Sequence, residues 1–137
     1  MRVTRYWAVH DSGTVINPAT ARSQVVGAVA QGIGWCLLED VVLGQGVMRN
    51  ANFLDYRIPG AGDMPEMTVE FVDSYEDNGP VGAKSLGEAA INPVVAAIAN
   101  AVHDAVGVRC TDLPFTPEVL WGLLQGRSET VAIGAGS

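Results

Sequence analysis

The residues best suited to chemistry lie close together in the segment 79–88, which reads GPVGAKSLGE. It holds three glycines, one lysine, one serine and one carboxylate, and a predicted helix follows it. Successive backbone N–H groups in a glycine-rich turn form a concave anion-binding surface, which the positive end of a following helix reinforces. The segment is not a nucleotide P-loop, because Ala83 separates Gly82 from Lys84 and the glycine spacing is too short. It therefore predicts an anion-binding turn of another kind.

Glu88, the last residue of this segment, has two interpretations. Acidic side chains are favoured near helix N-termini by about 0.3–1 kcal/mol, because the helix dipole attracts negative charge there. The surroundings favour a second interpretation, since residues 86, 87 and 89–91 offer neither water nor charge and Lys84 is the only cation nearby. A carboxylate desolvated in this way is suited to proton abstraction. We therefore predict that Glu88 is a desolvated general base beside a bound anionic group.

A second candidate site lies on the predicted helix 18–39. At 100° per residue, Gly27, Gln31 and Gly34 share one face of this helix, with Gln24 at its margin. A glycine face lets another backbone or a ligand approach closely, and a glutamine amide both donates and accepts hydrogen bonds. Two interpretations stay open: the glycines pack the helix tightly with Gln31 satisfied inside the domain, or Gln31 contacts a polar ligand.

Side chains that bind metal ions directly are too few to predict a metal site. His10 and His103 each precede an aspartate, but two histidines do not complete a ligand set. Cys36 and Cys110 lie far apart and form no CxxC pair, so we expect two buried free thiols in a reducing cytoplasm. We predict no metal ligand among the side chains of this chain.

The elements that must position these residues indicate an α+β domain over residues 1–127, with a flexible tail over 128–137. The predicted strands, which we expect to form a mixed sheet, are 3–9, 41–43, 47–49 and 67–72. The predicted helices are 18–39, 93–106 and 117–126. Asn17, Asn92 and Thr116 are the expected helix caps, and a proline follows each of them.

The predicted helix 93–106 is apolar on almost its whole circumference. Between Gly79 and Gly107 the only formal charges are those of Lys84, Glu88 and Asp104. A helix that is apolar on all sides is buried on all sides. We therefore expect a buried helix, covered either by this domain alone or on one side by another chain or domain.

Composition argues against several classes of function. The net charge of −7 and the eight scattered Lys and Arg residues argue against nucleic acid, whose phosphates bind clustered basic side chains. No apolar run approaches the roughly 20 residues that cross a bilayer, and residues 1–6 lack the apolar core of a secretion signal. Charged residues form 17% of the chain, below the roughly 25% usual in soluble domains. We predict a cytoplasmic protein with less water-adapted surface than usual.

Several short motifs, each weak alone, become specific through their order and spacing. In chain order they are DSG at 11–13, INP at 16–18, QGIG at 31–34, YRIP at 56–59, DMP at 63–65, GAKSLGE at 82–88, DAVG at 104–107 and TPE at 116–118. Through them the chain resembles, from about residue 6 to residue 124, the C-terminal end of the molybdopterin-binding large subunit of molybdenum hydroxylases. This is the family of xanthine dehydrogenase and aldehyde oxidase.

The resemblance implies a site in the second molybdopterin-binding domain of such an enzyme. Molybdenum would be held by the dithiolene of a pterin, and not by protein side chains. Glu88 would act as the general base in the hydroxylation of an aldehyde or N-heterocycle with water, and Gln31 would hydrogen-bond the cofactor. The backbone that would lie against the pterin is that of Ala83, Lys84, Ser85, Leu86 and Gly87.

The resemblance also implies partners, since the family's subunits are several times longer than this chain. The remaining molybdopterin-binding domains, an iron–sulfur module and an FAD module would complete the enzyme, and a bacterial type of pterin would carry a cytosine nucleotide. We therefore expect the isolated chain to hold no cofactor and to be inactive alone. The alternatives are a non-catalytic remnant that forms a homo-oligomer and serves as a scaffold, and an unrelated phosphate-binding domain.

Overall fold

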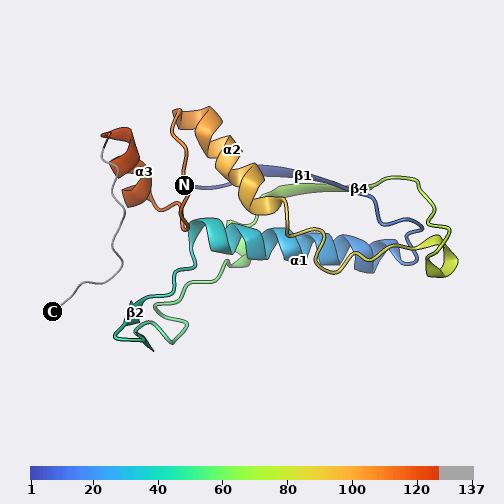
Figure 1. Ribbon diagram of the computed structural model, residues 1–137, viewed down its shortest axis with the longest axis horizontal. Coiled ribbons are helices and arrows are strands. Elements are labelled where there is room, and N and C mark those ends of the chain that lie inside the picture. Colours follow the sequence, from blue (N-terminus) through green and yellow to red (C-terminus); the bar gives the residue numbers. More distant parts are fainter. Residues whose placement is uncertain (127–137) are drawn as a thin grey trace.

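The computed structural model describes residues 1–126, so the predicted tail at 128–137 lies outside the described residues (Figure 1). The fold is α+β, as predicted. Its strands are β1 Arg5–His10, β2 Leu43–Gly44, β3 Val47–Met48 and β4 Glu66–Phe71. Its helices are α1 Pro18–Leu37, α2 Val94–Val106 and α3 Pro117–Leu124, with the short 3-10 helices η1 Ala61–Asp63 and η2 Pro80–Gly82. Among residues 1–126, no helix is both long and apolar enough to span a membrane.

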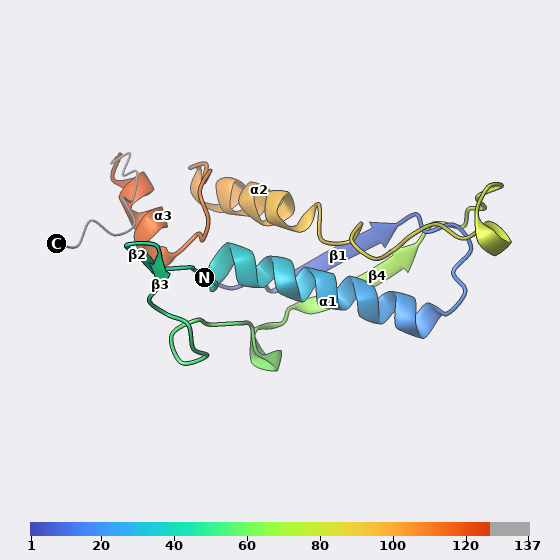
Figure 2. The same cartoon turned by 60° about the horizontal axis from the view of Figure 1, so that its bottom comes forward.

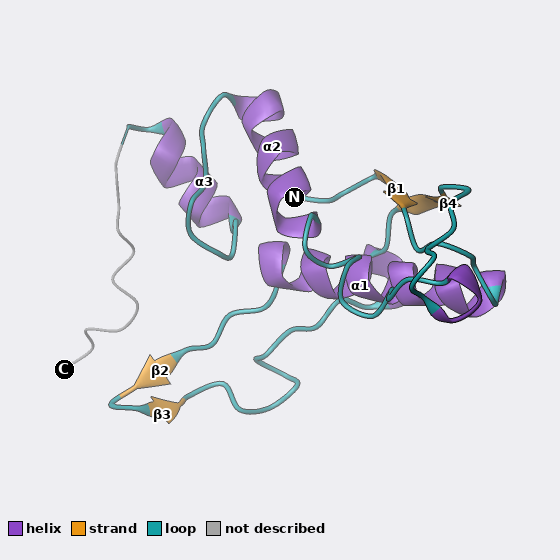
Figure 3. Cartoon of the chain, turned by 45° about the vertical axis from the view of Figure 1, so that its right-hand side comes forward, coloured by secondary structure: helices purple, strands orange, loops and turns teal. Residues whose placement is uncertain are grey.

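Two strands that are far apart in the sequence form the main sheet. β1 and β4 pair in parallel, with Arg5 opposite Glu66. β2 and β3 form a separate antiparallel hairpin, which lies away from β1 and β4 (Figure 3). The prediction of one mixed sheet is therefore wrong for the described residues. The tight turn at Gln45 and Gly46, both with positive φ, pairs β2 with β3, and each of these strands has only two residues to offer another strand.

α1 covers one face of the β1–β4 sheet (Figure 2). Its cap is the predicted one, because the side-chain oxygen of Asn17 accepts hydrogen bonds from the N–H groups of Ala19 and Thr20, both at 3.1 Å. Pro18 occupies the first turn, where the missing N–H removes no helical hydrogen bond. The start of α1 is thus fixed by local chemistry alone.

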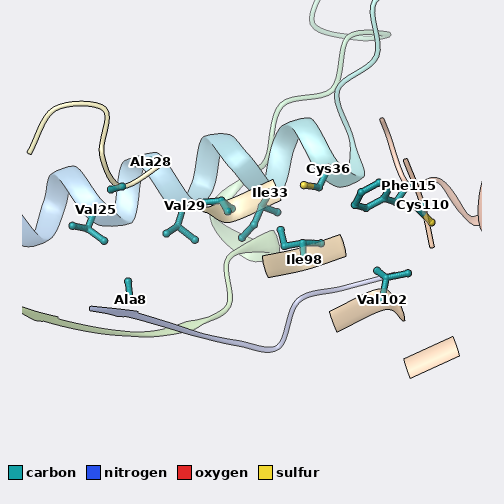
Figure 4. Close-up of a cluster of buried hydrophobic side chains, with 12 residues drawn as sticks. Ala8, Val25, Ala28, Val29, Ile33, Cys36, Ile98, Val102, Cys110 and Phe115 are labelled. Carbon is teal, nitrogen blue, oxygen red and sulfur yellow. The ribbon is translucent and has the colours of Figure 1, made fainter. Parts of the chain in front are cut away.

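α1 and α2 pack closely where Gly32 meets Val94. A Cβ added at Gly32 would lie 2.5 Å from Val94 Cγ1, so glycine is what permits this approach. Figure 4 shows the apolar side chains of the core along α1. The buried apolar residues are Ala8, Val25, Ala28, Val29, Ile33, Cys36, Ala90, Val94, Ile98, Val102, Cys110 and Phe115.

α2 is buried on one face only within the described chain. Val94, Ile98 and Val102 recur every four residues and form the buried face. Its exposed apolar residues include Ala96, Ala97, Ala101, Ala105 and Val106. The sequence analysis left two ways to cover this helix. The first, in which this domain alone covers it, is wrong for the described residues. Cover by another chain or domain stays a prediction.

Of the two other predicted helix caps, one is confirmed and one is wrong. The Thr116 side chain caps α3 as predicted and accepts a hydrogen bond from the Val119 N–H at 3.3 Å. The prediction that Asn92 caps α2 is wrong. Residues 87–93 continue as turns into the helix, so Pro93 takes the capping position without a side-chain hydrogen bond.

Both cysteines are buried free thiols, as predicted. Burial raises the pKa of the Cys36 thiol to about 11 and raises that of Cys110 as well. The backbone of Cys36 also serves the fold, because its carbonyl accepts a hydrogen bond from the Phe115 N–H at 2.6 Å. This contact joins the end of α1 to the segment before α3.

Candidate functional site

An open pocket of about 440 Å³ lies between α1 and the turn that precedes α2. Its lining residues are Gln24, Gly27, Ala28, Gln31, Trp35, Gly87, Glu88, Ile91 and Asn92. Gln31 and Glu88, which the sequence singled out in two separate segments, therefore line the same pocket. Gly87 is the other predicted site residue on its wall.

The helical period explains the wall that α1 supplies. Gln31 and Trp35 lie four residues apart and so follow one face of the helix. A Cβ added at Gly27 would meet no atom within 4 Å, so this glycine leaves the wall open. Gly34, which was expected on the same face, lies outside the lining. A Cβ there would lie 2.0 Å from Glu39 Oε1, so Gly34 makes room for a side chain of the protein itself.

The opposite wall is tied to α1 by one long-range hydrogen bond. Gln24 Nε2 donates to the carbonyl of Gly87 at 2.9 Å. The carbonyl of Glu88 accepts from the Ile91 N–H at 3.2 Å, which folds residues 88–91 into a turn. Gln24 stood only at the margin of the predicted glycine face. Its sequence position carries no sign of this contact, because the bond joins residues 63 positions apart.

An ion pair holds the start of the segment 79–88. Lys84 Nζ lies 2.6 Å from Asp11 Oδ2, just after the end of β1. The Ser74 hydroxyl and the Gly13 N–H also donate to Asp11. The Lys84 hydrogen bond, followed by those from Ser74 and Gly13, lowers the pKa of Asp11 to about 2. Lys84 thus pairs with Asp11 and is absent from the pocket lining that Glu88 joins.

The predicted anion-binding turn divides into two halves. The N–H of Ala83 donates to Pro80 O at 3.0 Å, and that of Lys84 donates to Ser12 O at 2.8 Å. In the part of the chain that the structure describes, the N–H groups of residues 85–88 donate to no protein acceptor. Within the described residues, and apart from the exposed Val81 N–H, only the second half of the turn can therefore bind an acceptor from outside.

The Glu88 side chain is exposed. Three apolar neighbours that were expected to desolvate Glu88 contribute to the core instead. Ala90 is buried in the core, and Leu86 and Ile91 pack against the core. The prediction of a desolvated carboxylate is therefore wrong for this chain by itself. The apolar run covers the core, and no described residue covers the wall of the pocket that carries Glu88.

The remaining pocket lining supplies amides and an aromatic ring. Gln31 and Asn92 make no side-chain hydrogen bond within residues 1–126, so both amides can still donate and accept. Trp35 is 39% exposed and adds an aromatic surface. The sequence did not mark Trp35 as a site residue and marked Asn92 only as a helix cap, so only their place in the fold assigns them to the pocket. The described residues contain no group of three or more His, Cys, Asp or Glu that could hold a metal ion.

A sequence model of the molybdopterin cofactor-binding domain family matches residues 1–65. The chain is 46% identical over 121 residues to a putative xanthine dehydrogenase molybdenum-binding subunit of Escherichia coli K12, covering 87% of this chain and 16% of that relative. It is 40% identical over 123 residues to the molybdenum-binding subunit of an aldehyde oxidoreductase from the same organism, covering 88% of this chain and 17% of that relative.

Solved structures have the same fold. Quinoline 2-oxidoreductase from Pseudomonas putida 86 matches with a TM-score of 0.85 and 35% identity, over 92% of this chain and 16% of that one. The aldehyde oxidoreductase of Desulfovibrio gigas matches with a TM-score of 0.83 and 30% identity, over 90% of this chain and 14% of that one.

The sequence matches and the shared fold define this chain as part of a molybdopterin cofactor-binding domain. It belongs to the xanthine dehydrogenase and aldehyde oxidase family of molybdenum hydroxylases and corresponds to part of the large, molybdenum-binding subunit. The predicted family is thereby confirmed. The chain spans only about 16% of the length of the relatives it matches.

Proposed function

We propose that this chain forms one wall of the cofactor cleft in a hydroxylase that oxidises an aldehyde or an N-heterocycle with water. The observation that carries the proposal is the meeting of Gln31 and Glu88 in one open pocket of about 440 Å³. With a free amide and a carboxylate on facing walls, the pocket can bind a ligand through the amide and accept a proton through the carboxylate.

The residues present fit a molybdopterin cofactor. The free N–H groups of residues 85–88 can bind acceptor atoms of the pterin or its phosphate, and the Gln31 amide can bind the pterin edge. Ala83 and Lys84 would contribute position and backbone contact, because their N–H groups are already used within the chain. When bound, the molybdenum centre supplies the redox chemistry. The cytosine dinucleotide form stays a prediction of the resemblance.

Glu88 is the proposed general base, which accepts a proton from the attacking oxygen of water. Its carboxylate is exposed among the described residues, so the desolvation that favours proton abstraction must come from polypeptide beyond residues 1–126. This is one reason why we propose that the chain is inactive alone and holds no cofactor by itself. One wall of an open pocket does not exclude water from a reaction.

The partners we propose are the remaining domains of the large subunit together with iron–sulfur and FAD modules. The chain spans about 16% of its relatives, and one of them is named as subunit gamma of a 6-hydroxypseudooxynicotine dehydrogenase complex. Exposed apolar side chains such as Trp7, at 62%, and Phe53, at 84%, also suit a surface that other polypeptide covers.

Assembly with these partners tests the proposed function. The chain would be expressed together with neighbouring gene products, and the purified complex assayed for molybdenum, for pterin and for dye reduction driven by aldehydes and N-heterocycles. We expect molybdenum in the complex, none in the isolated chain, and turnover only in the complex. A complex that forms stably but holds neither molybdenum nor pterin would show that the proposal is wrong.

A second candidate function is a non-catalytic scaffold that self-associates. The exposed apolar surface favours it, because such a surface drives association when its native cover is absent. Light scattering on the isolated chain separates the two. A defined homo-oligomer that binds none of the expected partners supports the scaffold, whereas a species that exchanges into the molybdenum-containing complex supports the enzyme.

A further inference from the structure

The outer edge of β1 is unpaired. The hydrogen bond from the Glu66 N–H to Thr4 O, at 3.1 Å, shows that the even-numbered backbone groups of the two strands face each other. Backbone groups alternate in direction along a strand, so the N–H and C=O groups of Arg5, Trp7 and Val9 face outward. Within residues 1–126, none of these outward groups has a hydrogen-bond partner.

The outer edge of β4 is protected instead. The guanidinium of Arg22, on α1, donates to Met67 O at 3.1 Å and to Val69 O at 3.4 Å. A charged side chain laid along a strand edge hinders pairing with another strand. The sheet therefore has one protected edge and one open edge, and only β1 is free to accept a further strand.

An apolar groove of about 480 Å³ lies beside the first half of the open edge. Residues 1–7 line one side of it, and the exposed face of α2 lines the other with Ala97, Ala101 and Ala105. Figure 2 shows the arrangement, with α2 on the side of β1 and α1 on the side of β4. Unpaired backbone groups thus lie beside the apolar helix face that this domain leaves uncovered.

We propose that a β-strand from the rest of the large subunit adds to the free edge of β1 and fills this groove. The inference rests on the proposed function, since it takes the occupant from the missing part of the same subunit. The relatives supply that polypeptide, because this chain covers only 16% of their length. Hydrogen bonds to the outward groups of Arg5, Trp7 and Val9 hold the strand, as in other cases of strand addition.

The groove also defines the side chains of the incoming strand. On the α2 side they are small and apolar, because they contact the alanine face of that helix. On the opposite side of the sheet, the side chains of the incoming strand lie beside Arg5 and Trp7. The Arg5 guanidinium lies 5.2 Å from the centre of the Trp7 ring. An acidic side chain beside Arg5 suits this end of the strand.

A second copy of this chain fits the groove less well. Of the described strands, β1 and β4 have six residues, and the outer edge of β4 is already covered by Arg22. β1 of a second copy would bring Tyr6 and His10 onto the face that meets α2. Both side chains are larger than the alanine face favours.

Amide hydrogen exchange on a hybrid subunit tests the proposal. In this hybrid, the present chain replaces the matching 121 residues of the Escherichia coli xanthine dehydrogenase subunit. We expect the N–H groups of Trp7 and Val9 to exchange rapidly in the isolated chain and slowly in the hybrid. The N–H groups of Tyr6 and Ala8, which face β4, are the internal control and exchange slowly in both.

Two substitutions on α2 give a matched comparison. Ala101→Glu places a carboxylate in the groove, whereas Ala96→Glu places one on the same helix outside the groove lining. Both positions are exposed, so both variants of the isolated chain should fold. With the rest of the relative's subunit supplied as a separate polypeptide, Ala101→Glu should weaken binding about tenfold or more, since it buries an unpaired charge. Ala96→Glu should leave binding unchanged.

Each outcome decides the proposal. A folded hybrid in which the Trp7 and Val9 amides still exchange rapidly overturns it, and so does equal binding by the two α2 variants. An isolated chain that dimerises with these amides protected also overturns it, because the occupant is then a second copy. If the hybrid does not fold, the same amides are followed in the two-polypeptide complex, where absence of protection or of a complex overturns it. If the amides are protected in a hybrid that holds no molybdenum, strand addition is supported and only the proposed function is contradicted.

Discussion

The two ends of the segment 79–88 differ in what the protein does with their polar groups. At the start, Lys84 is paired with Asp11, and its N–H donates to Ser12 O. At the end, the N–H groups of residues 85–88 have no acceptor in the described chain, and Glu88 is exposed. One continuous motif thus contains a half that the described chain satisfies, apart from the Val81 N–H, and a half that it does not.

This difference separates residues that hold the turn from residues that can bind. Polar groups that the chain satisfies internally stabilise the fold and have little left to offer a ligand. Free polar groups that water can reach cost little until a ligand replaces the water, and of residues 85–88 only Gly87 and Glu88 line the pocket. We therefore propose that Lys84, with its partner Asp11, holds the turn, and that the backbone of residues 85–88 and the Glu88 side chain serve binding and chemistry.

The largest expected effect is that of Glu88→Gln in the assembled enzyme. The amide keeps the shape of the side chain but cannot accept the proton, so turnover should fall by about 10²–10⁴-fold while molybdenum content stays unchanged. Steady-state dye reduction and metal analysis measure the two quantities. Glu70→Gln, on an exposed position of β4, is the control and should keep normal turnover. Near-normal turnover in Glu88→Gln would show that Glu88 is not the general base.

Glycine substitutions test the satisfied half through stability. In the isolated chain, Gly13→Ala should lower the free energy of unfolding by about 1–3 kcal/mol, because left-handed backbone is strained for alanine. Gly13 has φ +61, and its Cβ would lie 2.2 Å from Gly82 O. Urea denaturation measures the change.

The matched substitution for Gly13→Ala lies on the pocket wall. Gly27→Ala adds a Cβ that meets no atom within 4 Å, in the interior of α1. It should raise the free energy of unfolding by up to about 1 kcal/mol, since alanine is the better helix former. Equal destabilisation by the two substitutions would contradict the division of the site into structural and open parts.

The Asp11–Lys84 pair predicts a pH dependence. The pKa of Asp11 is lowered from 3.8 to about 2 in the folded chain, first by the hydrogen bond from Lys84. Because the folded pKa is the lower one, the contribution to stability is complete above about pH 4 and is lost as the pH falls toward 2. The free energy of unfolding should therefore decline in this range. Asp11→Asn should remove this part of the decline, and an identical pH profile in that variant would contradict the pairing.

The smallest expected effect is that of Gln24→Ala, which removes the hydrogen bond to Gly87 O. Since the bond is exposed, the free energy of unfolding should change by less than about 1 kcal/mol. A local effect should be clearer, because Glu88 O then holds the Ile91 N–H less firmly. Hydrogen exchange at Ile91 should become faster than in the unchanged chain. Unaltered exchange there would show that Gln24 does not position the turn.

Features set by neighbouring residues could be predicted from the sequence. The caps at Asn17 and Thr116 are confirmed, because a side-chain oxygen just before a proline in the first turn lies close to the first helix N–H groups. The same local pattern is not sufficient where other turns run into the helix start. Asn92 has similar neighbours but no cap, because the turns that carry Glu88 run directly into α2.

By itself, the sequence determined the family, the order of the helices and the residue types of the site. It singled out Gln31 because its amide lies on a glycine face of the helix, and Glu88 because its carboxylate ends a glycine-rich turn among apolar neighbours. Only the tertiary structure decided that these two residues share a pocket, that Lys84 pairs with Asp11, and that Glu88 is exposed. Helix caps depend on local geometry, whereas partners far apart in the sequence meet only where packing brings their elements together. In this chain, Gly32 against Val94 and Gln24 against Gly87 O are such contacts.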